Sequence, residues 1–129
     1  MAKACLTLRL SISALHELRN PDLSDEENKR IYGKCFHTHG HDYGLEVTVE
    51  GEINKNSGLC CDRDFFSDVL KKEFADKFTG KHLNTIFKNT SGEILVEEFF
   101  KIAKEKLKPL KVISVGLRET PKNFFLFKG

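Results

Sequence analysis

The sequence predicts an α+β domain with the element order β-β-α-α-β-β. Two N-terminal segments alternate apolar and polar residues, as half-buried strands do. Two central segments repeat apolar residues every three or four positions, which is typical of amphipathic helices, and two short extended segments close the chain. Because the 129 residues match the length of one domain and contain no repeat or linker, we expect a single domain over residues 1–129.

The first strand is expected over residues 4–13. Apolar side chains occupy every second position and polar ones lie between them: Leu6, Leu8, Leu10 and Ile12 against Thr7, Arg9, Ser11 and Ser13. Residues 14–34 contain an Asn-Pro-Asp turn signal and a charged run, so they predict a long connection with about one helical turn. Long connections of this kind often carry functional residues.

The second strand is expected over residues 41–53. Its apolar and polar positions again alternate: Tyr43, Leu45, Val47 and Val49 against Gly44, Glu46, Thr48 and Glu50. Turn residues at 54–58 end this strand, and a short segment at 59–61 leads into the first helix.

Two helices are expected in the middle of the chain. The first covers residues 63–78 with Asp62 as its N-cap, and its apolar stripe consists of Phe66, Val69, Leu70, Phe74 and Phe78. The second covers residues 91–107, where Thr90 and Glu93 fit a capping box and Pro109 stops the helix. Its inward side chains are Leu95, Phe99, Ile102, Ala103 and Leu107. Strands at 112–119 and 124–127, joined by a turn at 121–123, complete the fold.

The composition narrows the classes of function. The chain has 21 Lys and Arg against 19 Asp and Glu, so it lacks the basic surface of a nucleic-acid-binding protein, although a small polyanion could still bind. The N-terminus alternates polar and apolar residues instead of forming the apolar core of a signal peptide, and no apolar run is long enough to span a membrane. We therefore expect a cytoplasmic protein with reduced cysteines.

The segment Cys35-Phe36-His37-Thr38-His39-Gly40-His41-Asp42-Tyr43 predicts a metal site. In an extended chain, residues two apart point to the same side, so His39 and His41 project together with only a glycine between them. Zinc binds three or four nitrogen, sulfur or oxygen ligands, and a catalytic site stops at three protein ligands so that water or substrate can take the fourth position. A third ligand is therefore required.

Three residues are candidates for this third ligand. His37 has the correct parity but lies another ~6.5 Å along the strand. His16, just beyond the first strand, could approach from a neighbouring strand, and Cys35 could supply sulfur. Without a metal, the histidines would be ordinary surface residues and Cys35 a small buried side chain. Beside a divalent cation, by contrast, the Cys35 thiol would lose its proton more easily.

Taken in order, several motifs resemble the family of 6-pyruvoyl-tetrahydropterin synthases and bacterial 6-carboxy-tetrahydropterin synthases. These motifs, which span nearly the whole chain, are Ser13-Ala14-Leu15-His16, Leu23-Ser24-Asp25-Glu26-Glu27-Asn28, Gly33-Lys34-Cys35, His39-Gly40-His41-Asp42-Tyr43, Gly51-Glu52-Ile53 and Glu119-Thr120. The resemblance implies the tunnelling fold, a β-β-α-α-β-β unit whose subunits join their sheets into a barrel. It also implies a homo-oligomer, either a trimer or a hexamer.

The resemblance further implies a role for individual residues. His16, His39 and His41 take the positions of the family's zinc ligands, and Cys35 takes that of its catalytic thiol. Glu119 matches the carboxylate that holds the pterin ring, and Thr90 and Ser91 match the stretch beside that ring. The implied substrate is 7,8-dihydroneopterin triphosphate or a related pterin, which would lose triphosphate or undergo side-chain cleavage. The spacing around Cys35 gives conflicting indications of the pyruvoyl-forming and carboxy-forming branches.

The sequence departs from the family where protons are transferred. The family's Asp-His dyad falls on Thr79 and Gly80, and glycine cannot transfer a proton. His82, two residues later, is a candidate substitute if the loop shifts. Gly92 stands where the family has a glutamate, and a slipped helix start would bring Glu93 into that place.

Three hypotheses follow from these departures. The first is a zinc-dependent lyase of this family with an altered proton relay. The second is a zinc-containing, pterin-binding homologue without the standard activity. The third is a structural zinc site formed by Cys35, His37, His39 and His41 in an unrelated α+β domain.

Overall fold

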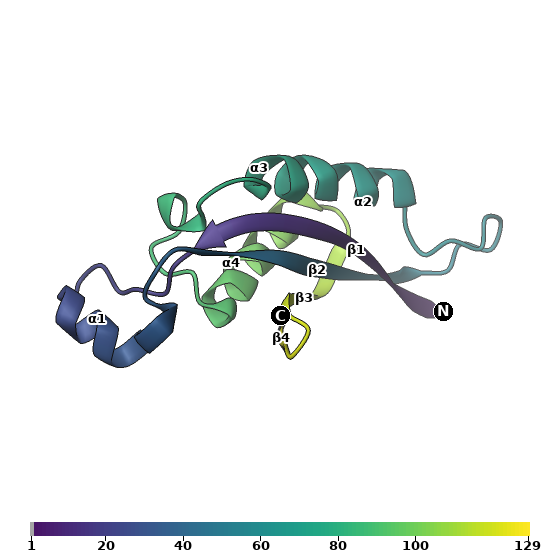
Figure 1. The fold of residues 1–129 in the computed structure, drawn as a ribbon. Helices are drawn as coiled ribbons and strands as arrows, with labels where there is room; N and C mark the ends of the chain where they lie inside the picture. Colours follow the sequence, from purple (N-terminus) through teal and green to yellow (C-terminus); the bar gives the residue numbers. More distant parts are fainter. Residues whose placement is uncertain (1) are drawn as a thin grey trace.

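A four-stranded antiparallel sheet with helices on one face forms the body of the protein in a computed structural model that describes residues 2–129 (Figure 1). The strands are β1 (Lys3–His16), β2 (His39–Glu52), β3 (Lys111–Thr120) and β4 (Asn123–Lys128). They lie in the order β1-β2-β3-β4, so β1 and β4 are the two edges of the sheet. The predicted α+β class and element order are confirmed.

The first two strands are longer than the sequence predicted. They pair without interruption from Lys3 opposite Glu52 to His16 opposite His39. Both strands therefore extend to the histidines, whereas the alternation of apolar residues stops before them. The side-chain pattern marked only the part of each strand that packs on the apolar core, while backbone pairing continues to its polar end.

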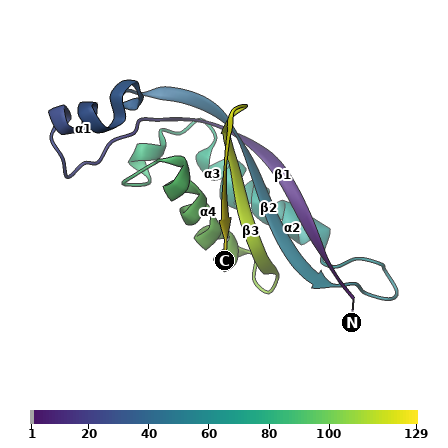
Figure 2. The ribbon, with the colours of Figure 1, turned by 90° about the horizontal axis from the view of Figure 1, so that it is seen from below.

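Helices α2 (Arg63–Leu70), α3 (Asp76–Phe78) and α4 (Gly92–Lys106) cover the same face of the sheet (Figure 2). A π-helical turn at Lys71–Ala75 joins α2 to α3, so the predicted helix at 63–78 is present with a bulge in its middle. Its predicted N-cap is also confirmed, because the Asp62 side chain accepts a hydrogen bond from the backbone N–H of Phe65 at 3.0 Å.

The predicted capping box at the start of α4 is wrong. Ser91 is the N-cap and accepts a hydrogen bond from the backbone N–H of Ile94, whereas the hydroxyl of Thr90 points to Glu17 and Asn84 instead. α4 begins at Gly92, so the helix start is not slipped and Glu93 remains exposed in the first turn. A side chain larger than hydrogen would not fit at Gly92 without movement, since an added Cβ would lie 2.1 Å from the ring of Phe125.

The long connection between β1 and β2 contains more structure than predicted. Instead of one turn, it forms helix α1 (Asp25–Tyr32), which starts with a capping box between Ser24 and Glu27 and is followed by a 3₁₀ turn at Gly33–Cys35. This segment projects beyond the end of the sheet, away from α2 and α4 (Figure 1). The buried Asn28 holds it in place, because its amide bonds to the backbone of Asn20 and Ser24.

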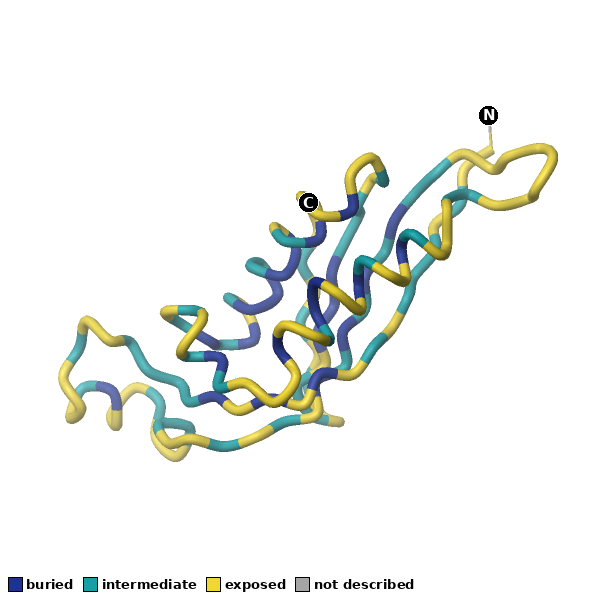
Figure 3. Tube along the Cα trace, turned by 90° about the horizontal axis from the view of Figure 1, so that it is seen from above, coloured by how far each residue is buried: buried dark blue, intermediate teal, exposed yellow. Residues whose placement is uncertain are grey.

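The apolar core lies between the sheet and the helices, where the buried segments of the chain face one another (Figure 3). Most of the predicted helix stripes are buried there, including Phe66, Leu70, Phe74, Phe78, Leu95, Phe99, Ala103 and Leu107. An aromatic cluster joins the helices, since the Phe99 ring lies 5.7 Å from that of Phe74 and 5.2 Å from that of Phe78. This packing sets the orientation of α4 and of the residues that precede it.

We expect Phe99→Leu to lower the free energy of unfolding by about 1–3 kcal/mol, because leucine loses the ring contacts and leaves part of the volume unfilled. Urea denaturation followed by circular dichroism measures this change. Lys101→Leu, on the exposed side of the same helix, is the control and should stay within about 0.5 kcal/mol of wild type. Equal stabilities for the two variants would contradict the central place of this cluster.

Candidate functional site

Three histidines converge where the paired strands β1 and β2 end. His16 closes β1, and His39 and His41 open β2 on the side of the sheet that faces the helices. The ring centroids are 4.5 Å apart for His16 and His39, 5.0 Å for His16 and His41, and 4.9 Å for His39 and His41. One ligand nitrogen from each ring lies within 4.8 Å of the other two, which is close enough for a single ion to be shared after small adjustments.

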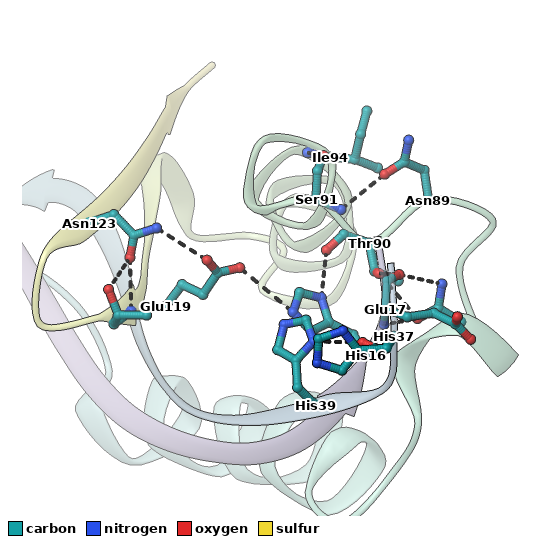
Figure 4. Close-up of polar contacts among 12 residues, drawn as sticks. His16, Glu17, His37, His39, Asn89, Thr90, Ser91, Ile94, Glu119 and Asn123 are labelled. Atoms are coloured by element: carbon teal, nitrogen blue, oxygen red, sulfur yellow. Dashed lines mark hydrogen bonds and ion pairs between the residues drawn. The ribbon is translucent and has the colours of Figure 1, made fainter. Parts of the chain in front are cut away.

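Backbone carbonyls fix the tautomers of two of these rings. The Nδ1–H of His16 donates to the carbonyl of Thr90 at 3.0 Å (Figure 4), and the Nδ1–H of His39 donates to the carbonyl of His37 at 2.8 Å. Because a carbonyl can only accept, each Nδ1 carries the proton and each Nε2 keeps a free lone pair. This is the arrangement in which a histidine ligates a metal through Nε2 while its other nitrogen is held by the protein.

Several buried polar atoms at this place lack partners. Within residues 2–129, the Nε2 atoms of His16 and His41 and the hydroxyl of Tyr43 have no hydrogen-bond partner, although all three are inaccessible to solvent. Leaving such atoms unpaired costs free energy that a bound ligand would recover. The donor set, the tautomers and the unpaired nitrogens therefore fit a divalent metal ion.

Burial favours the neutral imidazole at His16 and His41. His16 is only 1% exposed, and burial lowers its pKa from about 6.5 to about 4; His39 and His41 also lower it, whereas the Thr90 carbonyl and Glu119 oppose the shift. Burial lowers the pKa of His41 as well. Neutral imidazole is the form that binds metal, so these environments favour ligation at neutral pH.

The same shift predicts how the stability of the metal-free protein depends on pH. Between about pH 6.5 and pH 4 the unfolded chain binds a proton at His16 and the folded protein does not, so the free energy of unfolding falls as the pH falls. The expected slope approaches about 1.4 kcal/mol per pH unit. Urea denaturation at pH 6.5 and pH 5 should show this fall in the free energy of unfolding in wild type and in His37→Ala, and a smaller fall in His16→Gln. An equal slope in His16→Gln would contradict this assignment.

A carboxylate faces the histidines from β3. One oxygen of Glu119 lies 3.9 Å from Nε2 of His16, and the other accepts a hydrogen bond from the side-chain amide of Asn123 at 3.1 Å (Figure 4). Asn123 is held in turn by Thr120, whose backbone N–H and hydroxyl both donate to its side-chain oxygen. Glu119 keeps 17% of its side chain exposed, so it can still reach a ligand placed beside the histidines.

Neither alternative third ligand joins this cluster. His37 is exposed; its backbone carbonyl accepts from the His39 ring, and its own ring lies 5.6 Å from that of His39 but outside the cluster of ligand atoms. Cys35 ends the 3₁₀ turn after α1 and is partly exposed, with its carbonyl accepting from the backbone N–H of Leu18. Within the described residues, the set of closely spaced metal-ligating groups contains His16, His39 and His41 alone.

His82 lies in the loop that follows α3, which runs beside the end of β1. Its Nδ1 accepts from the backbone N–H of Asn84, so Nε2 carries the proton and lies 3.3 Å from the hydroxyl of Thr38. At the two positions of the family's dyad, Thr79 is exposed, and Gly80 adopts a positive φ of 78° and donates its N–H to Ser13. His82 is therefore half-buried at the border of the site, next to the strand that carries His39.

The predicted ring-side residues Thr90 and Ser91 precede α4. Thr90 is fully buried, and its carbonyl and hydroxyl bond to His16, Glu17 and Asn84. Ser91 caps α4 and is partly exposed. The sequence did not single out Asn84 or Asn123 as site residues, because an isolated asparagine in a loop has no spacing pattern that distinguishes it from a turn residue.

The fold and the site together define an α+β protein with a cluster of three histidines that could hold a metal ion and a carboxylate beside it. No helix within residues 2–129 has the length and apolar character that crossing a membrane requires. The model of the family "6-pyruvoyl tetrahydropterin synthase" matches residues 5–129, and the chain belongs to this family.

Individual relatives agree with this assignment. The chain is 35% identical to a 6-pyruvoyl tetrahydrobiopterin synthase of Dictyostelium discoideum, over 96% of this chain and 95% of that protein. It is 34% identical to the enzyme of that name from Drosophila melanogaster, over 98% of this chain and 80% of that protein. The solved structure of Caenorhabditis elegans 6-pyruvoyl tetrahydropterin synthase superposes with a TM-score of 0.93 at 28% identity, covering 100% of this chain and 97% of that one.

Proposed function

We propose that the protein is a zinc-dependent lyase that acts on 7,8-dihydroneopterin triphosphate or a related pterin. The observation that carries the proposal is the convergence of three histidines, two of which are oriented by backbone carbonyls at Nδ1, beside the partly exposed carboxylate of Glu119. The names of the relatives support the reaction class and a place in pterin biosynthesis.

Different residues of the chain would bind the metal, hold the pterin ring and transfer protons. His16, His39 and His41 would hold zinc, which when bound supplies Lewis-acid activation of the substrate's side-chain oxygens. Glu119 would accept two parallel N–H bonds from the pterin ring, as a carboxylate does with paired donors, and the Thr90-Ser91 segment would border the ring. Asn123 keeps Glu119 turned toward this place. Cys35 and His82 would transfer protons at the substrate side chain.

A second candidate function is pterin binding without the standard turnover. The observation in its favour is the loop at Thr79 and Gly80, which offers neither the acid nor the base of the family's dyad. Loss of one positioned acid–base group typically slows a reaction by 10²- to 10⁴-fold. In such a protein the residues that hold the metal and the pterin ring would be retained, whereas the residues that transfer protons would be lost.

A turnover assay separates the two functions. Purified protein is incubated with zinc and 7,8-dihydroneopterin triphosphate, and released triphosphate and acetaldehyde are followed over time. The lyase releases one of these products, and we expect Cys35→Ala and His82→Ala to slow that release by about 10²-fold or more. Tight pterin binding without product, unchanged in His82→Ala, would favour the binding function and refute the lyase.

We also propose that the protein is a homo-oligomer, a trimer or hexamer in which sheets join edge to edge. Among the described residues, β4 pairs only with β3, and its side chains Phe124 and Leu126 are 47% and 52% exposed. Within residues 2–129, the outer edge of β1 is bonded only near its end, where Ser13 and Leu15 contact the loop at residues 80–82. Unpaired edges of this kind are normally covered or joined. Gel filtration with light scattering should give at least three times the mass of one chain, and a monomer would contradict the proposal.

A further inference from the structure

His16 occupies a position that the sheet alone holds weakly. It is the last residue of β1, and its pairing with His39 is the last step of the ladder between β1 and β2. The next residue, Glu17, has left the sheet, and its backbone groups are bound by one side chain. The N–H of Glu17 donates to Oδ1 of Asn84 at 2.9 Å, and Nδ2 of Asn84 donates to the carbonyl of Glu17 at 2.9 Å. The Asn84 amide thus replaces a neighbouring strand at this point.

The same amide reaches the residue that orients the His16 ring. Oδ1 of Asn84 lies 3.2 Å from the hydroxyl of the fully buried Thr90, which also lies 3.1 Å from the carbonyl of Glu17. The backbone carbonyl of Thr90 then accepts the Nδ1–H of His16 at 3.0 Å. Asn84 is therefore bonded on one side to the residue after His16 and on the other to the acceptor of its ring proton (Figure 4 shows the contacts of Glu17 and Thr90).

We propose that Asn84 is a positioning residue of the metal site, which holds Glu17 and Thr90 together and thereby fixes both the backbone and the ring of His16. This role rests on the zinc site of the proposed function. Outer hydrogen-bond partners of metal-ligating histidines set the tautomer and direction of the ring, and their loss typically weakens metal binding 10- to 100-fold.

Two backbone hydrogen bonds anchor the loop that carries Asn84 to the end of β1. The N–H of Gly80 donates to the carbonyl of Ser13 at 2.7 Å, and the N–H of Leu15 donates to the carbonyl of Lys81 at 2.9 Å. The loop thus follows the last residues of β1 toward Glu17 and ends there with the two Asn84 bonds. Although this loop lacks the dyad of the family, it still supports the site by holding His16 in place.

The chemistry of the contact requires an amide. Asn84 donates from Nδ2 and accepts at Oδ1 in the same contact, which a carboxylate cannot do. In Asn84→Asp an oxygen would face the carbonyl oxygen of Glu17, so one attractive bond would become a repulsive contact. Asn84→Asp therefore tests the bonding at nearly constant volume, whereas Asn84→Ala removes all of it.

The test compares zinc binding and ring orientation in these variants. Zinc affinity is measured by competition with a chromophoric chelator, and the tautomer of His16 is read from ¹⁵N chemical shifts of the metal-free protein. We expect both variants to bind zinc about 10- to 100-fold more weakly than wild type. We also expect His16, held as the Nδ1–H tautomer in wild type, to become a mixture of tautomers.

A matched control separates positioning from general stability. Asn54 also organises a loop with its side chain, accepting from the backbone N–H groups of Asn56 and Ser57, but it lies after the opposite end of β2. Asn54→Ala should leave zinc affinity within about twofold of wild type. Thr90→Val, which keeps the carbonyl and nearly the same volume, should lie between wild type and Asn84→Ala and replaces the Asn84 variants if they do not fold.

The outcomes are distinguishable. If wild type binds zinc and the Asn84 variants bind it within about threefold, with the His16 tautomer unchanged, the positioning role is refuted. If wild type binds no zinc, the proposed function is refuted, and the ¹⁵N tautomer comparison alone decides whether Asn84 positions His16. Equal losses of zinc affinity in Asn84→Ala and Asn54→Ala would also overturn the inference, since they would reflect a general loss of stability only.

Discussion

His16→Ala is expected to bind zinc at least about 10³-fold more weakly than wild type and to lose product formation by a similar or larger factor. The variant removes one of three protein ligands and leaves two, too few for the geometry in which zinc keeps a position open. Several kcal/mol of charge stabilisation from the ion would be lost with it, and each 1.36 kcal/mol corresponds to about tenfold in rate. Zinc content after dialysis and the turnover assay measure the two effects.

His37→Ala is the matched control for this prediction. His37 lies next to the cluster in sequence but is exposed; its hydrogen bond with His39 uses the backbone carbonyl, which alanine retains, so the variant loses only the exposed ring that lies 5.6 Å from that of His39. We expect this variant to keep zinc affinity and turnover within about threefold of wild type. A larger loss in His37→Ala than in His16→Ala would exclude the proposed ligand set.

Glu119→Gln is expected to weaken pterin binding by about 10²- to 10³-fold while zinc remains bound. Glutamine cannot accept two parallel N–H bonds, because one of its two terminal atoms is an NH₂ donor, and hydrogen bonds to a charged partner contribute about 1.5–3 kcal/mol each. The substitution preserves the size of the side chain and lets Asn123 continue to donate to its oxygen. Titration of a fluorescent pterin measures the affinity, and metal analysis shows whether the ion is retained.

Glu50→Gln provides the comparison for the charge change. Glu50 lies on β2 and pairs with Lys111 at 3.5 Å, remote from the histidine end of the strand. It should bind pterin as wild type does, since an exposed ion pair of this kind contributes little. Unchanged pterin affinity in Glu119→Gln would remove the carboxylate from the proposed binding site.

The sequence predicted the architecture because the apolar residues carry it. Alternation along β1 and β2 and the stripes of α2 and α4 all report burial against one core, and the structure confirms them. Prediction from the sequence was wrong where hydrogen bonds, and not apolar burial, determine the bounds of an element. The strands run on to His16 and His39 through backbone pairing, and α1 depends on a capping box in a segment with little apolar pattern.

The sequence predicted only part of the candidate site. The spacing of His39 and His41 follows directly from the period of a strand. Spacing disfavoured His37 as the third ligand but did not decide between His16 and Cys35. The structure brings His16 to the other two because the register of β1 against β2 places His16 opposite His39. Asn84 and Asn123 escaped prediction because they act through single contacts between segments distant in the sequence.

Two adjacent residues, Thr90 and Ser91, both fit the N-cap position of α4 in the sequence. Thr90 followed by Glu93 has the spacing of a capping box, yet the adjacent Ser91 caps α4 equally well. Tertiary contacts decide between them, since the hydroxyl of Thr90 bonds to Glu17 and Asn84 while its carbonyl orients His16. Local sequence contains no information about these partners.

A crystal structure of the zinc-loaded protein, with the ion identified by anomalous scattering at the zinc edge, tests the metal site most directly. We predict one ion bound at about 2.0–2.1 Å by Nε2 of His16, His39 and His41, with a further position left to water or ligand. Divergent histidine rings, or an ion enclosed by four protein ligands that include the sulfur of Cys35, would contradict the proposed chemistry.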